Sequence, residues 1–166
     1  MLACIKHAFT CTGPILECGS GLSTLLVGGI AKKRDVEHIV FEHIGLWSNK
    51  MQRALNKYNL SNTRVCETPI KDCGDFSWYD ISAVTLPEHF ALIVCDGPPS
   101  SIKGGRYGLI PLMKNRFSAD CVILLDDADR AQEHDIVKQW QKEISMSMQV
   151  IGDSKPYFEL ITLPRD

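Results

Sequence analysis

The chain has 166 residues, of which 45% are hydrophobic and 23% charged, and its formal net charge at pH 7 is −2. These values predict a soluble globular protein of one domain, residues 1–166, and the small net charge argues against a nucleic-acid-binding surface. No run approaches the roughly 20 apolar residues of a membrane span, and residues 1–14 are too mixed for a secretory signal, so we expect a cytoplasmic protein with no membrane or nucleic-acid partner.

Short apolar runs alternate with segments of helical periodicity in the first half of the chain. The apolar runs predict buried strands, and the segments with apolar residues on one helical face predict the helices between them. In chain order these are strand 15–18, helix 22–30, strand 38–41, helix 47–58 and strand 64–67. Such alternation predicts parallel strands joined by right-handed crossovers.

The alternation continues in the second half of the chain and then changes. In chain order we expect strand 91–95, helix 107–117, strand 121–125, helix 137–144, strand 148–151 and strand 158–163. The short connection between the last two strands cannot hold a crossover helix, so these strands should pair antiparallel. The predicted fold is α/β, a Rossmann-like seven-stranded sheet with five parallel strands plus an antiparallel C-terminal hairpin and helices on both faces.

Carboxylates mark the ends of the predicted parallel strands. In an open parallel sheet, ligands bind beyond the carboxyl ends of the strands. The acidic residues at or beside these ends are Glu17, Glu42, Glu67, Asp96, Asp126 and Asp127. We therefore expect the functional site along this edge of the sheet.

A glycine turn, Gly19-Ser20-Gly21, follows the first predicted strand. Glycines let the backbone turn tightly and approach a ligand closely. The turn fits part of the dinucleotide-binding pattern G-x-G-x-x-G, but Thr24 stands where the third glycine is expected. An NAD-dependent oxidoreductase is therefore the alternative enzymatic prediction.

The charge beside this turn favours a different adenosine cofactor. Glu17 would repel a diphosphate, whereas S-adenosylmethionine carries an ammonium and a sulfonium group that a carboxylate attracts. We expect Glu17 to face this positive end, Glu42 to bind both ribose hydroxyls and His43 to lie beside the adenine.

Five segments together resemble the class I S-adenosylmethionine-dependent methyltransferases, and most closely their small bacterial methyltransferase-domain branch. The segments are ECGSGLS, FEH, VCDGPP, RYGL and ILLDDADR, and the resemblance extends over residues 13–164. It implies a seven-stranded fold with the last strand antiparallel. It also implies that the cofactor is bound by Glu17, Gly19, Ser20, Gly21, Ser23, Glu42, His43, Thr68 and Asp96.

Asp96 is the predicted catalytic residue. Methyl transfer needs an aligned nucleophile and, for a hydroxyl, a group that helps to remove its proton. We expect a small-molecule acceptor with an oxygen nucleophile. The sequence offers no evident pair of base and nucleophile, so an interaction domain that keeps this fold without turnover is the non-enzymatic alternative. A homodimer could complete the acceptor pocket.

Two further features near Asp96 have alternative interpretations. Asp96, Asp126 and Asp127 offer three hard oxygen ligands for Mg²⁺ or Ca²⁺, but Asp127 or Asp129 could instead cap the following helix, and the metal is the lesser expectation. Arg106 either holds a carboxylate or phosphate of the acceptor or belongs to a loop that leads into the next helix.

Overall fold

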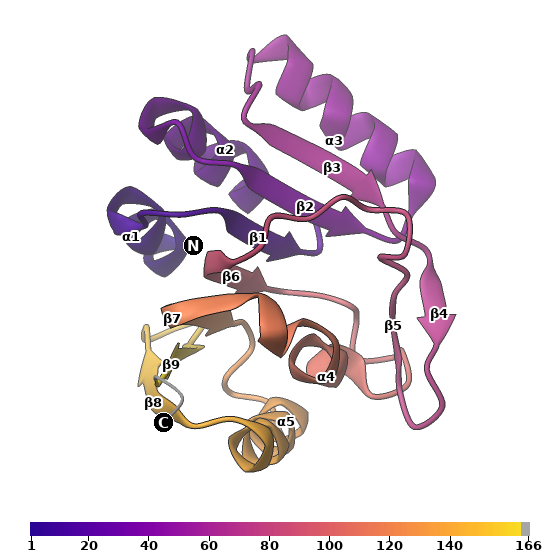
Figure 1. Ribbon diagram of the computed structural model, residues 1–166, viewed down its shortest axis with the longest axis vertical. Helices are drawn as coiled ribbons and strands as arrows, with labels where there is room; N and C mark the ends of the chain where they lie inside the picture. The colour runs from indigo at the N-terminus through magenta and orange to yellow at the C-terminus, as the bar shows by residue number, and fades with distance from the viewer. Residues whose placement is uncertain (164–166) are drawn as a thin grey trace.

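The computed structural model describes residues 1–163, so residues 164–166 of the predicted domain, and residue 164 of the resemblance, lie outside the described residues. Its main sheet has seven strands in the order β3-β2-β1-β6-β7-β9-β8 (Figure 1). They are β1 (Ile15–Cys18), β2 (His38–Glu42), β3 (Thr63–Glu67), β6 (Phe90–Cys95), β7 (Phe117–Leu125), β8 (Met146–Ile151) and β9 (Tyr157–Thr162). The first five are parallel, and β9 runs antiparallel to both β7 and β8. The expected sheet is confirmed.

The central strands are buried on both faces, which explains their unbroken apolar sequences. Their register also aligns their ends: Cys18 of β1 lies opposite Phe41 of β2 and Cys95 of β6, and Cys95 lies opposite Leu125 of β7. The carboxyl ends of four strands therefore meet at one edge of the sheet, where the sequence places its acidic residues and its glycine turn.

Three helices, α1 (Leu2–Thr10), α2 (Leu22–Arg34) and α3 (Gly45–Lys57), accompany β1, β2 and β3. The first two pack on the sheet through Cys4, Ala8, Val27 and Ile30, which contact Ile15, Leu92 and Val94. Helix α3 contacts α2, β2 and β3. The sequence did not predict α1, a helix of nine residues whose buried side chains are the small Cys4 and Ala8.

The other face of the sheet carries a small hairpin and the later helices (Figure 1). These are β4 (Ile70–Asp72) with β5 (Ser77–Tyr79), the 3-10 turn η1 (Gly105–Gly108), helix α4 (Leu109–Met113), the 3-10 turn η2 (Lys114–Arg116) and helix α5 (Ala131–Glu143). The expected helix 107–117 is thus a single α-helical turn between two 3-10 turns. None of the helices within residues 1–163 is both long and apolar enough to cross a membrane.

The β4–β5 hairpin lies between β3 and β6, in a segment for which the sequence predicted neither a helix nor a strand. Each of its strands has only three residues, too few for an alternating pattern to be recognised, and the chain turns at Gly74 with a φ of +90°. Within the described residues, no α-helix lies between β3 and β6, so the hairpin occupies the place of a crossover helix. It brings Trp78 and Tyr79 into the core.

Trp140 of α5 anchors the core beneath this hairpin face. Its ring is fully buried, and its Nε1 donates a hydrogen bond of 2.8 Å to the carbonyl oxygen of Tyr107. The contact ties α5 to η1, the turn that carries Arg106.

We predict that Trp140→Phe lowers the free energy of unfolding by about 2 kcal/mol, because it leaves a void and a buried carbonyl without a donor. Trp47→Phe is the matched control, since Trp47 is 37% exposed and makes one hydrogen bond at the surface. It should cost less than about 1 kcal/mol. Urea unfolding measures both values, and equal losses would contradict this account of the core.

Candidate functional site

The turn between β1 and α2 is built by two glycines and a threonine. Gly19 has a φ of +87°, a conformation that favours glycine, and its amide donates to the carbonyl of Phe41 on β2. The amide of Gly21 donates to Oγ1 of Thr24 over 3.0 Å. Thr24 therefore satisfies the amide at the start of α2 in the position where a dinucleotide-binding turn has its third glycine.

Glu17 lies beneath this turn and is fully buried. Its Oε1 accepts a hydrogen bond from the Ser23 hydroxyl, and its Oε2 lies 3.1 Å from Nε2 of His38 on β2. Nδ1 of His38 lies 3.2 Å from Oγ1 of Thr63 on β3. The carboxylate is thus paired within the protein, where Glu17 and Ser23 hold the first turn of α2 on the sheet. The expected contact of Glu17 with the positive end of a cofactor stays a prediction.

The sequence did not single out His38. The residue opens an otherwise apolar strand, and its register partner on β1 is Ile15, two residues before Glu17. Side chains two residues apart on a strand share a face of the sheet, so His38 and Glu17 lie on the same face. The sequence shows this spacing within each strand but does not give the register between the strands, and the pair could not be recognised without it.

Glu42, at the end of β2, contacts the glycine turn. Its Oε2 accepts hydrogen bonds from the amide and the hydroxyl of Ser20, at 3.1 and 2.7 Å, and its Oε1 accepts from the amide of Ile44 at 2.9 Å. The residue is only 4% exposed. A carboxylate offers about four acceptor positions, so rotation of the Ser20 hydroxyl would leave room for donors from a ligand.

His43 and Thr68 differ in their access to this edge. His43 is partly exposed, and its Nδ1 lies 3.4 Å from Oε1 of Glu42. Thr68 is fully buried, and its hydroxyl donates to the carbonyl oxygens of Glu42 and Cys66, both at 3.4 Å. The hydroxyl of Thr68 thus faces the backbone, and the expected role of this residue in cofactor binding stays a prediction.

Arg106 joins the ends of β6 and β7. It is 3% exposed, and its Nη2 lies 3.0 Å from Oδ1 of Asp96 and 2.8 Å from Oδ2 of Asp127. Its Nη1 donates to Oε1 of the buried Glu133 on α5 over 2.7 Å. Arg106 is therefore paired with carboxylates of the protein. It lies in the 3-10 turn η1 that leads into α4, in line with the second of its two interpretations, and its contact with an acceptor stays a prediction.

The same guanidinium bears on the candidate metal ligands. Carboxylate oxygens of Asp96, Asp126 and Asp127 lie within 4.8 Å of one another. Two of these residues are already paired with Arg106, and Arg130 lies 2.9 Å from Oδ2 of Asp127. A divalent cation would have to displace these positive groups, so the donor set does not fit a resident metal. The capping alternative is also wrong, since no side chain caps the start of α5.

Asp96 has the half-exposed position of a residue that can meet a ligand. Its side chain is 55% exposed at the end of β6. Partial burial and the neighbouring carboxyl group of Asp126 raise the pKa of Asp96 to about 6, although Arg106 opposes the change. At neutral pH the carboxylate is mostly ionised and has an affinity for protons higher than that of an ordinary aspartate.

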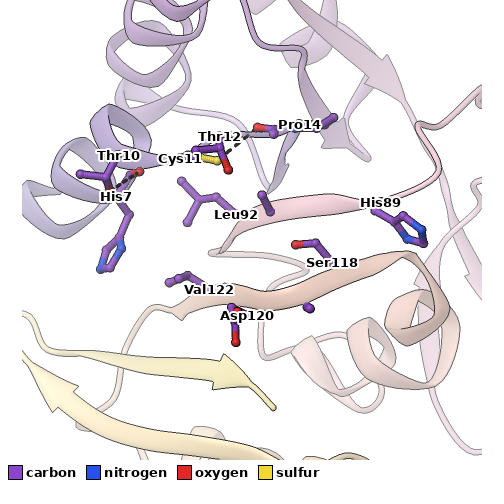
Figure 2. A pocket seen from close by; sticks show the side chains of 13 residues that line it. His7, Thr10, Cys11, Thr12, Pro14, His89, Leu92, Ser118, Asp120 and Val122 are labelled. Carbon is purple, nitrogen blue, oxygen red and sulfur yellow. Dashed lines mark hydrogen bonds between the residues drawn. The ribbon is translucent and has the colours of Figure 1, made fainter. Parts of the chain in front are cut away.

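A cavity of about 480 Å³ lies elsewhere, by the amino ends of β1 and β6 (Figure 2). Its walls include His7 of α1, Cys11 directly after that helix, Leu92 of β6, and Ser118 and Asp120 of β7. None of the residues expected to bind cofactor, acceptor or metal lines this cavity. The carboxyl edge of the sheet, where those residues gather, is therefore the candidate functional site.

No protein-family model matches the sequence, and no curated protein matches it either. Solved structures of methyltransferases nevertheless share its fold. Precorrin-6Y C5,15-methyltransferase of Geobacter metallireducens superimposes with a TM-score of 0.68 at 11% identity, over 98% of this chain and 87% of that one. An SAH-bound methyltransferase of Podospora anserina gives 0.66 at 16% identity, over 91% and 72%.

A third example is an RNA methyltransferase of Salinibacter ruber in complex with S-adenosyl-L-homocysteine. It gives a TM-score of 0.60 at 9% identity, over 99% of this chain and 90% of that one. The resemblance to class I methyltransferases is thus confirmed at the level of the fold.

We predict that Asp96→Asn stabilises the protein at pH 7.5 and not at pH 4. The folded-state pKa of Asp96, about 6, lies above that of the unfolded chain, so ionisation costs stability as the pH rises from about 4 to about 6. The full shift corresponds to roughly 3 kcal/mol, and exposure of the side chain reduces this to about 1 kcal/mol. Urea unfolding across this pH range provides the measurement. A variant less stable than the parent at pH 7.5 would contradict the raised pKa.

Proposed function

We propose that this protein is an S-adenosylmethionine-dependent methyltransferase that binds its cofactor over the turn between β1 and α2. One observation carries the proposal: the nearly buried Glu42 carboxylate and Ser20 meet directly beside Gly19. An acceptor pair for ribose hydroxyls and a backbone that permits close approach then lie side by side.

The donor set of the site suits a cationic adenosine compound better than a diphosphate. Glu42 and Asp96 present carboxylates at the carboxyl edge, and the cations next to them, such as Arg106, are already paired with acidic side chains. Thr24 takes the place of the third glycine that would let a dinucleotide approach α2. Both features disfavour the NAD-dependent alternative.

Each residue of the candidate site then has a defined role. Glu42 binds the ribose after the Ser20 hydroxyl has turned away, Gly19 lets the ligand lie close to the backbone, and Glu17 with Ser23 keeps α2 in place beneath it. When bound, S-adenosylmethionine supplies a methyl group that its sulfonium charge makes electrophilic. Asp96, with a pKa of about 6, is suited to accept the proton of a hydroxyl acceptor at neutral pH.

The acceptor we propose is a small molecule with an oxygen nucleophile. The net charge of −2 supports this over a polyanionic acceptor. The similar folds belong to enzymes with different acceptors in their names, a precorrin and RNA among them, so the fold does not decide this point. A domain without turnover would keep the cofactor contacts and lack the role of Asp96.

We predict that S-adenosylhomocysteine binds the protein and that Glu42→Gln weakens the affinity roughly tenfold or more, because the ribose donors lose a charged partner. Glu88→Gln is the matched control, since the side chain of Glu88 is 90% exposed ahead of the amino end of β6, and it should leave the affinity unchanged. Calorimetric titration gives both dissociation constants. Binding of NAD in place of S-adenosylhomocysteine would overturn the proposal.

For the acceptor, we predict that a methyl-labelled cofactor transfers its label to small hydroxyl compounds and that Asp96→Asn abolishes most of this transfer. The reason is that the amide cannot accept the proton. Scintillation counting of separated products measures the reaction. Label that appears in RNA alone would reject the small-molecule acceptor while leaving the cofactor proposal intact.

A further inference from the structure

Tyr79 of β5 buries a hydroxyl group that has no partner in the fold. The residue is 2% exposed, and its ring packs against Phe41, with 5.7 Å between ring centroids, and against Trp78, with 5.2 Å. Its Oη is buried and makes no hydrogen bond to any of residues 1–163. Because an unpaired buried hydroxyl destabilises a protein relative to a phenyl ring, it is a candidate for a group that pairs with a ligand.

The hydroxyl points to the contact between the two glycines that follow β1 and β6. A Cβ atom placed on Gly97 would lie 2.3 Å from Oη of Tyr79 and 3.3 Å from Cα of Gly19. The ring of Tyr79 also lies 6.3 Å from that of His43, at the end of β2. Tyr79 therefore extends along the carboxyl edge of the sheet, and its polar end is at the β1–β6 side.

The order of the strands indicates which part of the ligand would meet this hydroxyl. Along the sheet, β2 is followed by β1 and then β6. If Glu42 at the end of β2 binds the ribose, as the proposed function has it, the rest of the ligand that crosses Gly19 reaches Gly97 with its sulfur and amino-acid portion. This step rests on the proposed function.

We propose that the Tyr79 hydroxyl donates a hydrogen bond to the amino-acid carboxylate of the bound adenosyl ligand. A ligand carboxylate at this edge needs a donor, which the hydroxyl of Tyr79 supplies and the carboxylate of Asp96 does not. Burial raises the pKa of Tyr79 well above its ordinary value, so the group keeps its proton at neutral pH. Tyr79 is then a residue that distinguishes ligands with an amino-acid portion from those without one.

The test compares two ligands on two variants. Methylthioadenosine shares the adenosine and the sulfur of S-adenosylhomocysteine but lacks the amino-acid portion. Tyr79→Phe should weaken S-adenosylhomocysteine about tenfold and leave methylthioadenosine unchanged, because only the first ligand offers the carboxylate. Tyr58→Phe, at an exposed position after α3, is the control and should change neither dissociation constant.

The melting temperature without ligand provides the second measurement. It should stay the same or rise in Tyr79→Phe, because the variant removes an unpaired buried group and keeps the ring. A fall of several degrees would reveal a partner inside the fold and overturn the inference. Equal weakening of both ligands, or of neither, would overturn it as well. Failure of the parent protein to bind S-adenosylhomocysteine would instead reject the proposed function, and the inference with it.

Discussion

Acidic side chains converge at the carboxyl edge of this sheet, and each needs a partner because like charges at short range repel. The partners come from different elements. His38 and Ser23 contact Glu17, and Ser20 donates to Glu42. Arg106 pairs with Asp96 and Asp127, at the ends of β6 and β7. Asp96 keeps the largest exposure among these paired carboxylates. Asp96 is held by Arg106 through one oxygen and is still exposed enough to contact a ligand.

Close backbone contact is the second requirement at this edge. Gly19 and Gly97 lie in contact with no side chain between them, so that the ends of β1 and β6 approach each other closely. The hairpin between β3 and β6 brings Tyr79 next to Gly97. This hairpin stands where other parallel sheets have a crossover helix, so the position of Tyr79 is a consequence of this departure from regular strand–helix alternation.

Much of the sheet was predictable because its central strands are buried on both faces and give continuous apolar runs. The alignment of Glu42 with the glycine turn followed from the same reasoning. The orientation of Glu17 did not, because it depends on the register between β1 and β2. The burial of Arg106 depends on carboxylates from three separate segments, and no local pattern brings these together. The hairpin strands of three residues each and the nine-residue α1 were too short to be recognised.

We propose that the carboxyl edge above β1 and β2 binds S-adenosylmethionine, an adenosine compound that carries positive charge. A crystal structure of the protein grown with its product, S-adenosylhomocysteine, is the decisive measurement. We expect ligand density along Gly19 to Gly21, with the ribose hydroxyls on the carboxylate of Glu42. Density confined to the cavity between α1 and β7, with the glycine turn empty, would contradict it.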